Sequence, residues 1–311
     1  MFHHEASGAW LATLIFLGTY ALIVFERIPR AMAAMSGAAL VVLTGLLSQE
    51  EAVASIDFNT IGLLIGMMVI VAITRRSGVF EYLAVWVAKR SGGEPVRILV
   101  TLSLLTAVLS ALLDNVTTVL FTVPVAMVLA NRLKVNPFPY LVAQILASNI
   151  GGTATLIGDP PNIMIGHPAG LSFNDFLYNL APVSAFILVV TLFLLVLLYR
   201  RQLRIPPERR EQVITLKEDE FLKDRALIKP ALTVLALTLV GFGLHGWLHL
   251  STATIALAGA TVLILLTREE PEEIFLAVEW PTLFFFGGLF VVVGALEKTG
   301  VMETVARAGL E

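Results

Sequence analysis

The sequence contains no cysteine and few charged residues. The absence of cysteine among its 311 residues excludes disulfides, thiolate nucleophiles, cysteine-ligated zinc and iron–sulfur clusters. Charged residues make up only 14% of the chain, against roughly 25% in an ordinary soluble domain. The 21 Lys and Arg nearly balance the 24 Asp and Glu, so no basic excess indicates nucleic-acid binding, and we expect no nucleic-acid partner.

Long apolar segments take the place of the missing charges. Hydrophobic residues make up 57% of the chain, and a series of segments approaches the roughly 20 residues that a helix needs to cross a bilayer. Two more stretches, 96–130 and 139–170, are apolar but interrupted by polar and helix-breaking residues. The composition predicts an all-α polytopic membrane protein whose simple spans are residues 9–25, 31–48, 58–74, 178–199, 230–248, 252–267 and 281–296.

The basic residues predict the orientation of these spans. We place the N-terminus outside, let 96–130 enter and leave on one side, and let 139–170 cross once. All Lys and Arg except Lys298 and Arg307 then fall on the cytoplasmic side, as the positive-inside rule requires. The pattern predicts an integral, multi-pass protein of the plasma (inner) membrane, with residues 200–229 in the cytoplasm.

The chain also matches itself without a gap at an offset of 222 residues. Positions between Ala34 and Ala84 recur between Ala256 and Ala306, including the pair Glu50–Glu51 and three glycines. An odd number of crossings separates the copies, so we expect an inverted repeat, which is typical of secondary transporters. The expected division is a first repeat in 1–199, a cytoplasmic linker in 200–229 and the start of an inverted second repeat in 230–311.

The second repeat is shorter than the first. The equivalent of Asp114 would lie past Glu311, so we expect an incomplete sequence of a protein of roughly 420 residues, the length that a complete second repeat gives. A half-size protein that completes itself by dimerising is the alternative.

The first interrupted stretch, 96–130, places Asp114 and Asn115 between apolar arms at 98–113 and 116–130. At 1.5 Å per residue these arms reach about 22 to 24 Å, short of a ~30 Å hydrocarbon core. We therefore expect a re-entrant hairpin whose tip stops inside the membrane, with Asp114 capping the second arm and Thr117 nearby. The alternative is an aqueous turn between two full helices.

The second interrupted stretch, 139–170, predicts a broken helix. Gly151, Gly152 and Gly158 permit unusual backbone geometry, and the prolines at 160 and 161 stop a helix. A break at membrane depth exposes carbonyl groups on one half and N–H groups on the other; the alternative is a surface loop. The polar side chains in reach of the break are Ser148, Asn149, Thr153, Thr155, Asp159 and Asn162.

These motifs resemble a known family. Residues 57–166, with DFNTIGLLIGMMVIVA, LLDNVTTVLFTVPV and SNIGGTATLIGDPPN, resemble the ion transporter superfamily in its ArsB/NhaD permease branch, which holds arsenite permeases, sodium/proton antiporters and the melanocyte P protein, with the last most alike. The resemblance implies an elevator-type transporter, usually a homodimer, in which hairpins and broken helices form the moving site. Related dicarboxylate carriers have Ser-Asn-Thr at the hairpin tip and Thr or Ser before Pro-Pro-Asn, whereas this chain has Asp114-Asn115-Val116 and Asp159.

We therefore expect secondary active transport of a small inorganic ion, by Na⁺/H⁺ antiport or arsenite/antimonite efflux. Asp114 and Asp159 would bear the charge and hold any transported Na⁺; we expect no other metal, no catalytic residue and no cofactor beyond Na⁺ or H⁺ as coupling ion. A citrate or dicarboxylate permease, an ion channel, and a hydrolase using Ser148 and His167 are the alternatives. The expected partners are the ion or small solute, the lipid bilayer and a second copy of the chain. The expected site comprises Asp114, Asn115, Thr117, Ser148, Asn149, Gly151, Gly152, Thr153, Thr155, Gly158, Asp159 and Asn162.

Overall fold

The computed structural model describes residues 2–166 and 168–310, and in this part of the chain every regular element is helical. The helices are α1 (Phe2–Phe25), α2 (Arg30–Leu43), α3 (Gln49–Ala54), α4 (Phe58–Arg76), α5 (Val79–Arg90), α6 (Pro95–Leu112), α7 (Asn115–Leu133), α8 (Phe138–Gly152), α9 (Pro160–Gly166), α10 (Phe173–Tyr199), α11 (Pro207–Ile214), the 3-10 helix η1 (Glu218–Phe221), α12 (Arg225–Leu248), α13 (Thr252–Thr267), α14 (Pro271–Leu276), α15 (Trp280–Lys298) and α16 (Val301–Leu310).

Seven of these helices are long and apolar enough to cross a membrane: α1 from Gly8 on, α4, α6, α7, α10, α12 and α15. The predicted all-α polytopic membrane protein is confirmed at this level. The expected span 31–48 is too long, because α2 ends at Leu43 and Gly45 then turns the chain with a positive φ of 75°. Apolar composition continues past this turn, but the helix does not.

The chain forms two compact units. The first unit runs up to Leu64 and resumes at Val278; the second unit spans Ile65–Ala277. In the first unit, α15 packs against α1 and α2 around Val41, Val292 and Ala295, which are fully buried. Gly288 of α15 lies so close to the backbone of Ala34 that an added Cβ would be 2.7 Å from it.

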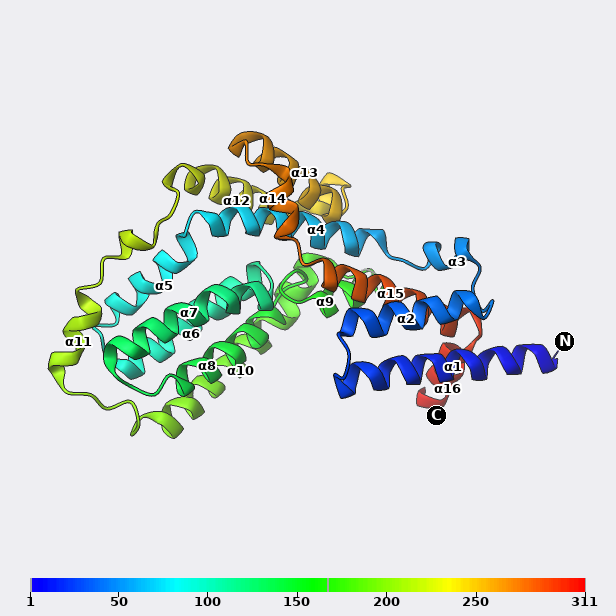
Figure 1. Cartoon of the computed structure of the whole chain (residues 1–311), viewed down its shortest axis with the longest axis horizontal. Coiled ribbons are helices and arrows are strands. Elements are labelled where there is room, and N and C mark those ends of the chain that lie inside the picture. Colours follow the sequence, from blue (N-terminus) through cyan, green and yellow to red (C-terminus); the bar gives the residue numbers. More distant parts are fainter. Residues whose placement is uncertain (1, 167, 311) are drawn as a thin grey trace. The chain divides into compact units, whose positions relative to one another are not determined.

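The second unit is built around α6, α7 and α8, with α5 and α10 packed beside them (Figure 1). One of its hydrophobic core clusters contains fully buried leucines and alanines from these helices, together with Tyr140 of α8. α12 packs against α13, and Gly66 in α4 brings its backbone against Ala256 of α13, where an added Cβ would lie 2.6 Å from the Ala256 carbonyl carbon. All expected site residues lie in this unit.

The linker, residues 200–229, packs against α5. It contains α11 and η1 and ends at Asp224, which caps α12, so Pro230 lies inside that helix and not at its start. The Lys223 amide donates to the Ser77 carbonyl oxygen at 2.9 Å, and an ion pair joins Lys89 to Glu218. The linker belongs to the second unit, and its helices α11 and η1 lie beside α5 (Figure 1).

Helix bounds repeat at the offset found in the sequence. α3 and α14 begin at Gln49 and Pro271, and α4 and α15 span Phe58–Arg76 and Trp280–Lys298. Gly78 and Gly300, which precede α5 and α16, have positive φ values of 78° and 74°. The equivalent elements lie in different units for the most part, so each compact unit takes helices from both copies.

Candidate functional site

The hairpin tip consists of Leu113 and Asp114, between α6 and α7. Asp114 caps α7 as predicted, with its Oδ1 accepting a hydrogen bond from the Thr117 amide at 2.7 Å. The cap leaves the first N–H groups of α7 directed at the space beside the Asp114 carboxylate. A negative charge is thereby placed at the positive end of a long helix.

The arms of this hairpin are longer than the sequence suggested. α6 has 18 residues and α7 has 19, or about 27 to 28 Å at 1.5 Å per residue, and both satisfy the length and composition of a membrane span. The arm bounds 98–113 and 116–130 are therefore wrong, because Glu94 caps α6 before Pro95 and α7 continues to Leu133. The re-entrant path of the hairpin stays a prediction.

The helix break in the second stretch is confirmed. α8 ends at Gly152 and α9 begins at Pro160, with no helix between them. Pro160 begins a helix instead of stopping one, because the first helical position has no intrahelical partner for an N–H group. The break therefore brings the carbonyl end of α8 and the start of α9 to one loop, residues 153–159.

The three glycines of this region serve close packing and not unusual dihedral angles, since none of them has a positive φ. A Cβ on Gly151 would lie 2.2 Å from the Ala107 carbonyl oxygen of α6. A Cβ on Gly158 would lie 2.5 Å from the Gly152 carbonyl oxygen and 2.7 Å from that of Ser110. Glycine here lets α6, α8 and the loop approach backbone to backbone.

Several expected ligands are engaged in holding the loop. The Asn162 amide donates to the carbonyl oxygens of Gly152 at 3.2 Å and Thr155 at 2.8 Å. The Thr155 hydroxyl donates to the Ala111 carbonyl oxygen and accepts from the Gly158 amide. The Ser148 hydroxyl donates to the Ile145 carbonyl oxygen at 3.1 Å. These side chains fix the shape of the site more than they offer free ligand atoms.

Thr153 lies on another side of the break. Its exposed side chain donates to the Ile150 carbonyl oxygen at 2.8 Å and contacts the Ser184 hydroxyl of α10 at 3.1 Å. Thr153 therefore ties the end of α8 to α10.

The remaining polar groups meet at the tip of the hairpin. The Asn115 side-chain amide donates to Asn149 Oδ1 at 3.2 Å and joins the tip of the hairpin to the end of α8. Asp159 directly follows Gly158, which packs closely against the Ser110 carbonyl oxygen near the end of α6. Among the described residues, the Asp159 carboxylate has no hydrogen-bonding partner. The two acids thus lie on two chain breaks that contact each other.

A buried polar ladder behind the site was missed at the sequence level. The Ser110 hydroxyl donates to the Ser148 carbonyl oxygen at 2.7 Å, and one turn earlier Thr106 donates to Gln144, which reaches Ser103 at 3.4 Å. The spacing of serine and threonine at 103, 106 and 110 gives one face of α6, a signal that could have revealed the ladder. It sets the register between α6 and α8.

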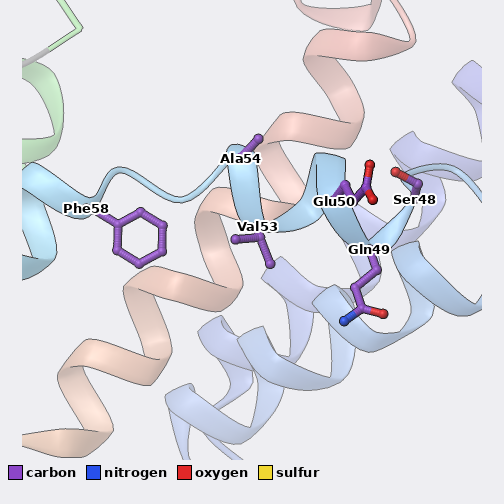
Figure 2. A pocket seen from close by; sticks show the side chains of 6 residues that line it. All are labelled: Ser48, Gln49, Glu50, Val53, Ala54 and Phe58. Atoms are coloured by element: carbon purple, nitrogen blue, oxygen red, sulfur yellow. The ribbon is translucent and has the colours of Figure 1, made fainter.

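A hollow lies in the first unit, which contains none of the expected site residues. Figure 2 shows its lining, which is Ser48, Gln49, Glu50, Val53, Ala54 and Phe58, around a volume of about 920 Å³. Glu50 is the only acid in this lining, and the Ser48 hydroxyl is engaged in capping α3 with Glu51. The hollow therefore has no paired carboxylates like those of the second unit.

His167, the base of the hydrolase alternative, lies outside the described residues. Among the residues that are described, no group of three or more His, Asp and Glu side chains could hold a metal ion.

Comparison with known proteins indicates a transporter. The family model described as "Citrate transporter" matches residues 20–310. A 46 kDa membrane protein of Mycobacterium leprae is 46% identical over 302 residues, covering 96% of this chain and 70% of the relative. An uncharacterized transporter of Mycobacterium tuberculosis is 45% identical, covering 97% and 71%. The human P protein is 34% identical, covering 96% of this chain and 45% of its own length.

Proposed function

Since this chain belongs to the citrate transporter family of the ion transporter superfamily, we propose that it is a secondary active transporter of a small inorganic ion bound between Asp114 and Asp159. The observation that carries the proposal is that the hairpin bearing Asp114 and the helix break bearing Asp159 contact each other, through Asn115 with Asn149 and through Thr155 with Ala111. An acid at membrane depth is a functional residue by default, because burying it without a partner is costly.

The charge balance of the site favours a cation or a neutral solute. No Lys or Arg occurs between Arg97 and Arg132, or between Lys134 and Arg200. Carboxylate and amide oxygens suit hard cations, so Na⁺ or H⁺ is the proposed cargo or coupling ion. Arsenite or antimonite in a neutral form would bind through hydroxyl and amide groups. The proposed ligands are Asp114, Asn115, Asn149 and Asp159, with Thr117 and the ordered loop around them.

A citrate or dicarboxylate permease is the second candidate, favoured by the description of the family model. A polycarboxylate would meet two like charges at Asp114 and Asp159, so it would need cations bound with it. This candidate therefore also assigns a cation to the two acids.

The test is a flux panel on the purified chain in proteoliposomes. Radioactive Na⁺, a pH-sensitive dye, arsenite and citrate are supplied in turn under an imposed Na⁺ or pH gradient. We expect Na⁺-dependent or H⁺-dependent flux that saturates with substrate. Conductance far above carrier turnover would instead indicate a channel, and the absence of flux for all four probes would contradict the proposed cargo.

We further propose that the two sequence copies form inverted repeats that pack against each other. The ion pair between Arg76 and Glu273 in the second unit has its counterpart, at the same offset of 222 residues, in the pair between Lys298 and Glu51 in the first. The contact of Gly66 with Ala256 has its counterpart in Gly288 with Ala34. Reciprocal contacts of this kind support a pseudo-two-fold relation between the copies.

We also propose that the protein lies in the plasma membrane with the N-terminus outside and residues 200–229 in the cytoplasm, because all Lys and Arg except Lys298 and Arg307 would then lie inside. The ion pairs are compatible with the crossings assumed here: Arg76, Glu269 and Glu273 would share one side of the membrane, and Lys298 and Glu51 would share the other. An elevator-type movement of the site-bearing second unit and assembly as a homodimer complete the proposal, as the family resemblance implies.

A further inference from the structure

Two helices of the second unit, α7 and α10, end beside the start of α8. α7 ends at Leu133 and α10 ends at Tyr199, and both residues belong to the same buried core cluster. The Tyr199 ring also packs edge-on against Phe138, with the ring centroids 6.5 Å apart. The charged residues that accompany these two helix ends therefore lie on one side of the unit.

Five cations lie at these two helix ends, and we call them the cationic rim: Arg132 and Lys134 at the end of α7, and Arg200, Arg201 and Arg204 after α10. All five are exposed, and in the part of the chain that the structure describes none of them makes an ion pair. Leu203, at 2% exposure, packs into the core between Arg201 and Arg204 and fixes this short segment in place.

Acidic residues do not neutralise the rim. No Asp or Glu occurs in residues 115–158 or 176–207. Glu94 lies at the neighbouring start of α6, but its carboxylate accepts hydrogen bonds from the Val96 and Arg97 amides and caps that helix. α11 brings Glu208 and Glu211, which its own arginines at 209 and 210 balance.

The rim lies where a membrane-spanning segment meets the headgroups. α7 and α10 are both long and apolar enough to cross a bilayer, and their cations follow in the last turn or directly after it. Tyr199 is a residue type that is enriched at this level. A guanidinium group matches a phosphate with two parallel hydrogen bonds, and juxtamembrane basic clusters attract anionic lipids.

We propose that the cationic rim is a binding site for the headgroup phosphates of anionic phospholipids. The positive-inside rule explains why basic residues lie on this side, but it does not require that all five stay exposed and without an acidic partner. The proposal is independent of the transported ion, because the rim lies at the opposite end of α7 from Asp114.

Native mass spectrometry of the purified full chain tests the proposal. Phosphatidylglycerol is titrated into detergent-solubilised protein, with phosphatidylcholine and inorganic phosphate in parallel arms. Two rim variants, Arg201→Gln with Arg204→Gln and Arg132→Gln with Lys134→Gln, are compared with a control that removes two linker charges outside the rim, the half-buried Arg209→Gln with the exposed Lys217→Gln.

We expect saturable retention of phosphatidylglycerol, little retention of phosphatidylcholine and no displacement by millimolar phosphate. Each rim variant should lose affinity by about tenfold or more, since one Lys or Arg near an anionic surface contributes about fivefold. The control variant should bind as the parent chain does. Equal loss in the control, equal retention of phosphatidylcholine, displacement by phosphate, or unchanged binding in both rim variants would each overturn the proposal.

Discussion

Asp114 has two roles that a single substitution separates. Its carboxylate caps α7 and carries the proposed ion-binding charge. Asparagine keeps the cap, because its side-chain oxygen still accepts from the Thr117 amide, but removes the charge. We expect Asp114→Asn to fold normally and to reduce transport by about a hundredfold, the factor that corresponds to about 2.7 kcal/mol of lost binding.

The matched control for this change is Asp224→Asn. Asp224 also caps a long helix, since its carboxylate accepts from the Ala226 amide at 2.8 Å, but it lies in the exposed linker. Flux in proteoliposomes should be unchanged in Asp224→Asn. Equal loss of flux in both variants would show that capping, and not the charge at Asp114, limits transport.

Gly151 permits the close approach of α8 to α6. An added methyl group would lie 2.2 Å from the Ala107 carbonyl oxygen, so the two helices would have to separate. We expect Gly151→Ala to destabilise the protein by about 1–3 kcal/mol, the usual cost of overpacking, measured as a lower thermal midpoint by tryptophan fluorescence. Gly246→Ala in α12 adds its methyl group to open space and should leave the midpoint unchanged or raise it.

At the scale of elements, the linker is held to α5 by a contact that depends on pH. The hydrogen bond from Lys89 lowers the pKa of Glu218 below its ordinary value of 4.5. Because the pKa of Glu218 is lowered, its contact with Lys89 stabilises the docked linker at any pH above the ordinary pKa of the carboxyl group. This stabilisation is lost as the pH falls through the lowered pKa. We therefore expect the linker to leave α5 more readily in acid.

Spin labels at Trp86→Cys and Glu220→Cys measure this movement directly, since the chain has no native cysteine. The distance distribution should broaden at low pH, and Glu218→Gln should remove the part of the pH dependence that this pair supplies. Asp219→Asn breaks only an exposed pair with Arg225, in which the side chains are 69% and 70% accessible, so it should keep the pH dependence. A distance distribution that is equally broad at neutral pH would contradict the packing of the linker against α5.

The breaks in the helices were predictable, whereas their exact ends were not. Asp114–Asn115 and the glycines before Pro160 interrupt otherwise apolar runs, and both breaks occur as expected. Helix length differs from apolar length because charged ends can remain helical, as Arg132 does in the last turn of α7. Conversely, the apolar run after Leu43 leaves the helix at Gly45.

Contacts between distant segments could not be predicted from the pattern. Asn115 and Asn149 are 34 positions apart, and Ser110 and Ser148 are 38 apart. Nothing in either segment specifies the other as its partner; only the packing of α6 and α7 against α8 brings them together. This is why Thr155 and Asn162, selected as ligands by residue type, are found holding the loop.

At the scale of the whole molecule, self-similarity identified which segments are equivalent but not which ones touch. In each unit, a long helix from one copy pairs through its end with a short helix from the other: α4 with α14, and α15 with α3. An offset in the sequence gives no information on such cross-pairing. The reciprocal ion pairs therefore add evidence on the arrangement of the two copies that the sequence comparison lacked.

The proposed inversion of the two sequence copies can be tested by labelling introduced cysteines, because the chain has no native cysteine. Glu50 and Glu272 are equivalent positions at the offset of 222 residues, at the start of α3 and α14. If the copies are inverted, a membrane-impermeant thiol reagent added to intact cells should label Glu50→Cys, and Glu272→Cys should be labelled only after the membrane is opened. Thr215→Cys in the linker serves as the cytoplasmic reference. Labelling of positions 50 and 272 from the same side would show that the copies run parallel. The Arg76–Glu273 and Lys298–Glu51 ion pairs would then have to lie on the same face of the membrane.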